Sequence, residues 1–432
     1  MSQISPIAIC ASTSMRVKNS HASLSLALML CTGFNGAQAM SYVMMKDVDL
    51  YTQSSGVLSG VVTSSESNNG ETRYRLAQLE YLRSDGKNQA LEELVLPGGL
   101  IGDGAAMADR ASASAQRFEG VRKPELGQRV LVFFERDNVG KIRPMQLMLG
   151  LFFETKIGDD RLYRRDLEAG ENQGARNVEY AAPRDAQGFE QWVRTGAQAE
   201  ISYLRPQFAY LANTPMAKFT QIRNGGTPVR WFKFGNNLSE SWSALAGGIA
   251  GSVTQFQSAL NAWSNDSGSN IRYDFAGTVA SNPGNVSIIL FDDPNNQIAG
   301  SFNCAQGGTL AIGGPSFQLS PTNFNGTSYF PITRGIVVTQ DGAACFFNGN
   351  GGNDGAEVLA HELGHTLGYA HACGDSESPT CGSSAVFNDA LMRAFAHGDG
   401  RGASLRADDI AASLAVYPDG SVPPIVFKNG FE

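Results

Sequence analysis

The chain has 432 residues, of which 42% are hydrophobic and 17% are charged, and it contains 49 glycines. This composition is typical of a folded, loop-rich protein with about two or three domains, and it argues against a disordered or fibrous chain. The formal net charge is -8, and no dense run of Lys and Arg is present. Nucleic acid and anionic membrane surfaces are therefore excluded as predicted partners.

Residues 1–39 have the three-part pattern of an export signal. Arg16 and Lys18 precede an apolar run at residues 22–31, and the small residues Ala-Gln-Ala follow at 37–39. We predict cleavage after this tripeptide and a secreted or periplasmic mature chain that is free of the membrane. The alternative, a membrane helix, would need ~20 apolar residues, about twice the length of this run.

Residues 40–165 are predicted to form a small β-sandwich or barrel. Short strand-like segments alternate with turn residues such as Asn-Asn-Gly at 68–70 and Pro-Gly-Gly at 97–99. No charged cluster or ligand set in this part supports chemistry. The predicted strands are 56–63, 72–82, 94–97, 129–134 and 146–153.

Residues 166–226 are interpreted as a partly helical connector, because Phe189, Trp192 and Val193 recur at helical spacing within an otherwise irregular stretch.

Residues 227–418 are predicted to form a mixed α/β domain. A strand-like segment at 229–232 precedes a helix whose apolar residues recur every three or four positions from 253 to 263. Two apolar runs, 286–291 and 335–339, have the β-branched content and length of buried strands. No internal repeat is evident.

Within this domain, residues 361–371 read HELGHTLGYAH. His361 and His365 are four apart, so they share one face of a helix and can reach the same ion. Gly368 lets the chain leave the helix through a left-handed or otherwise strained turn, which would bring His371 back as a third ligand. Three imidazoles leave open the fourth position that a catalytic zinc needs, whereas structural zinc sites usually have four protein ligands.

Glu362 lies next to a predicted ligand but points elsewhere around the helix. We expect it to take a proton from zinc-bound water, whose pKa falls to roughly 7, and to pass that proton to the leaving amine. Asp354 and Glu357 are three apart, and this spacing predicts a capping box at the start of the helix. The motif therefore predicts zinc-dependent hydrolysis of peptide bonds.

The segment 361–371 resembles the extended zinc motif of the metzincin metallopeptidases, and among them the chain is most similar to the matrixins. Residues 389–392 (Asp-Ala-Leu-Met) resemble the matrixin Met-turn, and residues 407–411 resemble the start of the final catalytic helix. The resemblance covers about residues 227–418. The β segment before it also resembles, more loosely, a small domain that precedes such catalytic domains in secreted bacterial proteins.

This resemblance implies an α/β (α+β) metzincin-like catalytic domain with a mixed sheet and a zinc-motif helix. It implies one catalytic zinc, Met392 as an apolar floor beneath it, and a protein or peptide substrate bound in a cleft across the metal. The sequence departs from animal matrixins in several ways. No histidine lies between 227 and 360, and no cysteine of the mature chain precedes Cys304. A histidine-bound structural zinc and latency through a propeptide cysteine are therefore not expected.

Four cysteines remain after the predicted signal, and an even number in an exported chain favours disulfides. Three pairings are possible. We predict Cys373 with Cys381, which would close a short loop, and Cys304 with Cys345. A cysteine metal site is the alternative, but the sequence has no CxxC spacing.

Asp292 and Asp293 follow a predicted strand in an oxygen-rich loop, and they are candidate calcium ligands as well as ordinary turn residues. His397 and Asp399 are expected in a solvated loop, with a substrate-contact role as the alternative. Residues 419–432 are predicted to be a C-terminal tail, either a processing tag or a frayed end.

Two other functions remain open at this point. One is an exported binding or adhesion protein that holds zinc without turnover. The other treats residues 40–226 as an inhibitory module that covers the cleft until it is cleaved away. The oligomeric state is not predicted.

Overall fold

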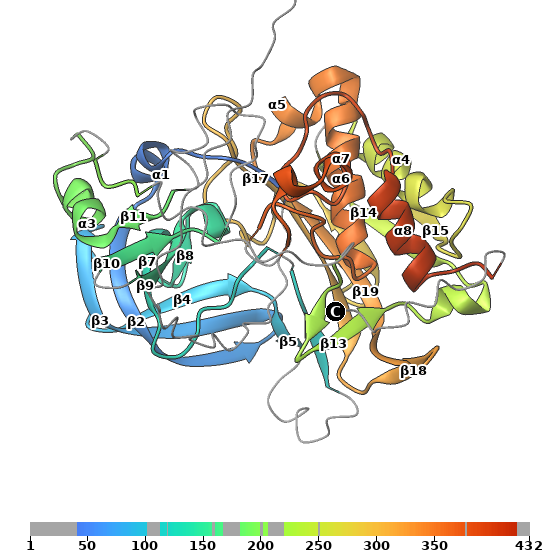
Figure 1. Cartoon of the computed structure of the whole chain (residues 1–432), viewed down its shortest axis with the longest axis horizontal. Helices are drawn as coiled ribbons and strands as arrows, with labels where there is room; N and C mark the ends of the chain where they lie inside the picture. The colour runs from blue at the N-terminus through green and yellow to red at the C-terminus, as the bar shows by residue number, and fades with distance from the viewer. Residues whose placement is uncertain are drawn as a thin grey trace, which may run out of the picture. The chain divides into compact units, whose positions relative to one another are not determined.

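The computed structural model describes residues 41–101, 113–118, 120–157, 160–166, 182–198, 202–205, 220–248, 251–375 and 378–420. The predicted signal at 1–39 lies outside the described residues, as do 421–432 of the predicted tail and much of the predicted connector. The described residues from Ser41 onward belong to one compact unit. They form a mixed α/β fold with two large sheets, which Figure 1 shows.

The first sheet lies in the N-terminal half and contains eight strands among the described residues. β8 pairs with both β4 and β7, so the path β7-β2-β3-β4-β8 closes into a barrel. The strands are β2 (Gly56–Asn68), β3 (Glu71–Arg83), β4 (Glu92–Pro97), β7 (Arg129–Arg136), β8 (Ile142–Pro144), β9 (Leu151–Ile157), β10 (Asp160–Arg164) and β11 (Arg184–Asp185). Two helices, α1 (Asp47–Gln53) and α3 (Ala186–Arg194), accompany this sheet.

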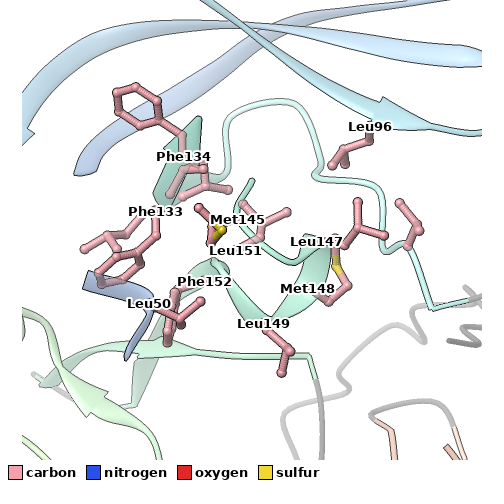
Figure 2. Packing of buried hydrophobic residues seen from close by; sticks show 14 of the residues in the cluster. Leu50, Leu96, Phe133, Phe134, Met145, Leu147, Met148, Leu149, Leu151 and Phe152 are labelled. Carbon is pink, nitrogen blue, oxygen red and sulfur yellow. The ribbon is translucent and has the colours of Figure 1, made fainter. Parts of the chain in front are cut away.

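The core of this half explains its sequence pattern. Strand β7 is buried over residues 130–134, so the side chains on both faces of the strand pack in the core. This explains why residues 130–134 form a continuous apolar run. Figure 2 shows Phe133, Phe134 and Phe152 in this core, together with Leu50 of α1. Burial of each such side chain contributes about 1.5–3 kcal/mol.

The second sheet contains eleven strands among the described residues, in the order β15-β14-β16-β19-β17-β6-β5 with four strands off this path. β14 pairs in parallel with β15 and β16, β16 pairs in parallel with β19, and β17 runs antiparallel to β19. The strands are β1 (Ser41–Val43), β5 (Gly99–Ile101), β6 (Ser114–Gln116), β12 (Arg223–Asn224), β13 (Thr227–Arg230), β14 (Glu240–Leu245), β15 (Tyr273–Val279), β16 (Ser287–Leu290), β17 (Gly308–Gln318), β18 (Thr322–Phe324) and β19 (Thr327–Thr339).

Helix α6 (Asn353–Thr366) packs against β17, β19 and helix α4 (Ser252–Ser264), and Figure 1 shows it beside β19. Trp263 of α4 donates its indole N–H to Ala360 O at 2.8 Å, and Trp231 donates to Thr366 O at 2.8 Å. These two buried bonds fix α6 at its middle and at its end. The other α-helices among the described residues are α5 (Ala344–Phe347), α7 (Ala385–Asp389) and α8 (Ala407–Val416).

Two local predictions are wrong. The segment predicted as one strand at 146–153 is a short 3-10 turn (Leu147–Leu149) followed by β9, because Gln146 has φ 53° and Leu147 also has φ 53°. The predicted capping box of α6 is also absent: the N-cap is Gly352, and no side chain caps it. Asp354 and Glu357 instead accept hydrogen bonds from the loop that follows residue 395.

Candidate metal centre

Helix α6 brings two predicted ligands to one face, and the chain then returns with the third. Gly368 has φ 94°, its N–H donates to His365 O at 2.9 Å, and a Cβ atom there would lie 2.7 Å from Val229 O. Only glycine fits this exit without strain. His361, His365 and His371 are buried, and their ligand atoms all lie within 4.8 Å of one another. The sequence prediction that these three side chains converge therefore agrees with the geometry.

Hydrogen bonds fix the tautomers of the two helical histidines. His361 Nδ1 lies 2.8 Å from Leu391 O, and His365 Nδ1 lies 2.8 Å from Tyr369 O. A carbonyl oxygen only accepts, so each Nδ1 carries the proton and each Nε2 presents a lone pair. The two Nε2 atoms are 2.7 Å apart. Two facing lone pairs at that distance cannot bond to each other, so the pair fits a cation, and imidazole nitrogens suit zinc.

The third histidine has a carboxylate partner that the sequence analysis missed. His371 Nδ1 donates to Asp375 Oδ2 at 2.6 Å, and both side chains are buried. Asp375 Oδ1 accepts from Ser378 N at 2.7 Å. The predicted disulfide between Cys373 and Cys381 is present and closes the loop that carries Asp375. A carboxylate within a few residues of a predicted histidine ligand is the signal that could have identified it.

Met392 lies against the helix between the two helical histidines. A Cβ atom on Gly364 would lie 2.3 Å from Met392 Sδ, so the glycine of the motif leaves room for this sulfur. Asp409, at the start of α8, accepts from Leu391 N at 2.9 Å and from Met392 N at 3.1 Å. Burial raises the pKa of Asp409 to about 7, although these backbone donors act in the opposite direction. The sequence analysis identified this helix start but not the role of Asp409.

Glu362 follows His361 in α6 and is fully buried. Its Oε1 accepts from Ser41 N at 3.1 Å, and among the described residues no geometric hydrogen-bond partner of its Oε2 is found. Burial raises the pKa of Glu362 to about 7, and the bonds from Ser41 act to lower it. A buried carboxylate poised near neutral pH can both accept and return a proton.

The other predicted sites have mixed outcomes. The disulfide between Cys304 and Cys345 is present. Within the described part of the chain, the three histidines are the group that could hold a metal through at least three His, Cys, Asp or Glu side chains. Asp292 has φ 55°, and Asp293 Oδ2 accepts from Ile298 N at 2.7 Å, which is a turn arrangement. Calcium binding there stays a prediction.

The expectation of a solvated loop is confirmed at Asp399, which is exposed, but is wrong at His397. The side chain of His397 is only 5% exposed, and its Nδ1 lies 2.7 Å from Glu357 Oε1. The contact ties the loop after the Met392 segment to α6, one turn before His361.

Among the described residues, no helix is both long enough and apolar enough to cross a membrane.

Comparison of the sequence with protein-family models and with curated proteins gave no match. Among solved structures, the chain is similar to high choriolytic enzyme 1, a hatching enzyme zinc-protease from the medaka fish Oryzias latipes. The match has 12% identity and a TM-score of 0.26, and it covers 45% of this chain and 96% of the other. A likeness at this level carries no argument about function.

Proposed function

We infer that the chain is a zinc-dependent endopeptidase with a metzincin-type, matrixin-like catalytic domain at about residues 227–418. The observation that carries this proposal is the convergence of three buried imidazoles, two of them with fixed lone pairs facing each other, beside the buried carboxylate of Glu362. Three nitrogen ligands with a neighbouring acid or base are the donor set of a hydrolytic zinc rather than of a closed structural site.

Each side chain has a separate task in the proposed reaction. A zinc ion held by His361, His365 and His371 would supply Lewis acidity, lowering the pKa of a water molecule and polarising a peptide carbonyl. Glu362 accepts a proton from the attacking water and delivers it to the leaving amine, which breaks the peptide bond. The backbone acceptors of the Nδ1 protons, and Asp375, keep the imidazoles oriented during these steps.

Strand β17 supports a peptide as the substrate. It lies against α6 so closely that a Cβ atom on Gly313 would be 2.4 Å from Glu362 O. One edge of β17 pairs with β19, and its other edge pairs with β1, whose Ser41 N donates to Glu362 Oε1. An extended peptide that adds to this edge would place its main chain next to Glu362.

Export is part of the same proposal. Two disulfides support an oxidising compartment, the secreted or periplasmic location that the first 39 residues predict. Protein or peptide is the proposed partner.

Metal content and hydrolysis test the proposal together. We expect one zinc per purified chain and cleavage of a denatured general protein substrate, which a zinc chelator abolishes and added zinc restores. His371→Ala should lose both zinc and cleavage. Zinc retained by His371→Ala, or cleavage that survives the chelator, would contradict the proposed centre.

A further inference from the structure

The outer edge of β17 is covered by two strands from the N-terminal half of the chain. β1 pairs with its first part, with Ser41 opposite Ala311 and Val43 opposite Gly308. β6 pairs with its last part, from Ser114 to Gln116 opposite Gln318 to Ser316. Both pairings are antiparallel, so β6 and β1 run in one direction along the same edge. An added peptide strand would follow this track.

β1 is also held from its other side. Tyr42 forms a parallel bridge with Phe395, and their ring centroids are 6.4 Å apart. The Tyr42 hydroxyl donates to Gly374 O at 3.2 Å. The segment therefore lies between β17 and the chain that follows Met392, and Tyr42 is fully buried there. These are contacts on both sides of the chain, as expected for a peptide in a cleft.

The start of β1 reaches the proposed reaction centre. Ser41 N donates to Glu362 Oε1 at 3.1 Å, and the bond is buried. The carboxylate that would have to meet the attacking water is thus engaged by the chain's own backbone. The backbone groups of β17 at residues 308–311 are likewise used by β1, so they cannot pair with a substrate at the same time.

The segment is anchored just beyond the strand. Asp47 Oδ1 accepts from Arg165 Nη2 at 2.6 Å and from Arg184 Nη2 at 3.0 Å, and Arg165 Nη1 donates to Met45 O at 2.9 Å. All of these side chains are buried. β1 is therefore tied at residues 45–47 to the N-terminal half, and it enters the centre from that anchor.

We propose that β1 is an autoinhibitory strand: residues 41–43 occupy the peptide-binding edge of β17 and the proton acceptor Glu362. They must leave before a substrate can bind, so the hydrolysis expected of the purified chain comes from the fraction of molecules in which β1 is displaced. This inference rests on the proposed function for the identity of the site. It assigns the inhibitory role to a three-residue strand and its anchor, rather than to the whole of residues 40–226.

Occupancy of the site can be measured without catalysis. The probe is a fluorescein-labelled peptide hydroxamate, a zinc-chelating peptide, and its binding to the zinc-loaded full chain is followed by fluorescence anisotropy. Tyr42→Ala removes the ring from Phe395 and the bond to Gly374, so a larger fraction of chains should be open. We expect at least about tenfold tighter apparent binding, because affinity scales with the binding-competent fraction. Tyr42→Phe keeps the ring and should show a smaller change.

Zinc content and thermal unfolding confirm that each variant is folded. Unchanged or weaker probe binding by folded, zinc-loaded Tyr42→Ala would overturn the proposal, because it would make β1 a permanent part of the sheet.

A cross-link provides the opposite test. Residues opposite one another in antiparallel strands have Cα separations of about 4.5–5.5 Å, within the range that a disulfide spans. The double variant Ser41→Cys/Ala311→Cys should bind the probe at least about tenfold more weakly when oxidised than when reduced. The wild-type chain under the same reductant controls for the two native disulfides.

Locked and reduced forms that bind the probe equally would overturn the proposal. Hydrolysis measured on the same samples separates the two claims. Probe binding that depends on β1, with no hydrolysis by any form, would show that β1 covers the site and would refute the peptidase. Hydrolysis that the cross-link does not reduce would support the peptidase and refute autoinhibition by β1.

Discussion

Asp375 Oδ2 lies 2.6 Å from His371 Nδ1, and the pair is sealed from solvent within a loop that the Cys373–Cys381 disulfide closes. The carboxylate orients the imidazole. The loop that the Cys373–Cys381 disulfide closes therefore supplies a partner to the third histidine.

Asp375→Ala should weaken zinc affinity by about 10–100-fold, the usual cost of losing such a partner. Competition with a chromogenic zinc chelator measures it. The exposed Asp160→Ala serves as the control for loss of one negative charge and should leave zinc affinity unchanged. Equal zinc affinity in the Asp375 variant and the wild type would show that the hydrogen bond has no influence on the metal.

Gly368 should be intolerant of a side chain. Gly368→Ala combines a left-handed backbone, costing about 1–3 kcal/mol, with a Cβ 2.7 Å from Val229 O. We expect a loss of unfolding free energy and of zinc affinity. Gly351→Ala is the matched control, because it has φ 69° but nothing within 4 Å of an added Cβ. If chemical denaturation gives the two variants equal losses of unfolding free energy, the loss comes from backbone strain alone and not from the contact with Val229 O.

Asp409 should position the Met392 segment. It accepts backbone bonds from Leu391 and Met392, and Leu391 O in turn fixes the His361 tautomer. Asp409→Asn turns one acceptor into a donor facing these N–H groups, which should cost about 1–3 kcal/mol of unfolding free energy. The chemical shift of the His361 ring should change with it. An unaltered His361 environment would show that Asp409 only caps helix α8, where it accepts from Arg406 N at 2.8 Å.

Asp47 gives the anchor of β1 a pH dependence. Burial alone would raise the pKa of Asp47, but Arg184 and Arg165 outweigh it and hold the pKa below its ordinary value. The stabilisation is therefore complete above the unfolded value of about 3.9, and it is lost as the pH falls through the folded value.

The unfolding free energy of the wild type should thus fall more steeply below about pH 4 than that of Asp47→Asn. At pH 7 the variant should be less stable by about 3–5 kcal/mol, because Arg165 and Arg184 lose their buried partner. Unfolding free energies that vary with pH in the same way in both proteins would contradict the lowered pKa of Asp47.

Local patterns predicted much of the fold. Helix α4 follows from apolar periodicity, and strand β16 follows from the β-branched content and length of its apolar run. The convergence of the three histidines follows from their spacing and Gly368. Positions set by long-range contacts were not predictable. Strand β1 has three residues and no pattern, because its conformation comes from pairing with a strand some 270 residues later.

The same reason explains the errors at Asp354 and Glu357. A carboxylate three positions from another satisfies the capping pattern, but these two have stronger partners in the loop near His397. Asp375 and Asp409 were missed because their hydrogen-bond partners are specified by folded loops rather than by spacing.

The most direct test of the central claim is peptide hydrolysis by Glu362→Gln in the zinc-loaded Tyr42→Ala chain, with Tyr42→Ala alone as the reference. The amide preserves the shape of Glu362 but cannot accept the proton. The account predicts one bound zinc in both proteins and a rate about 10²–10⁴-fold lower in the Glu362 variant. Full hydrolysis by the zinc-loaded Glu362→Gln chain would contradict it.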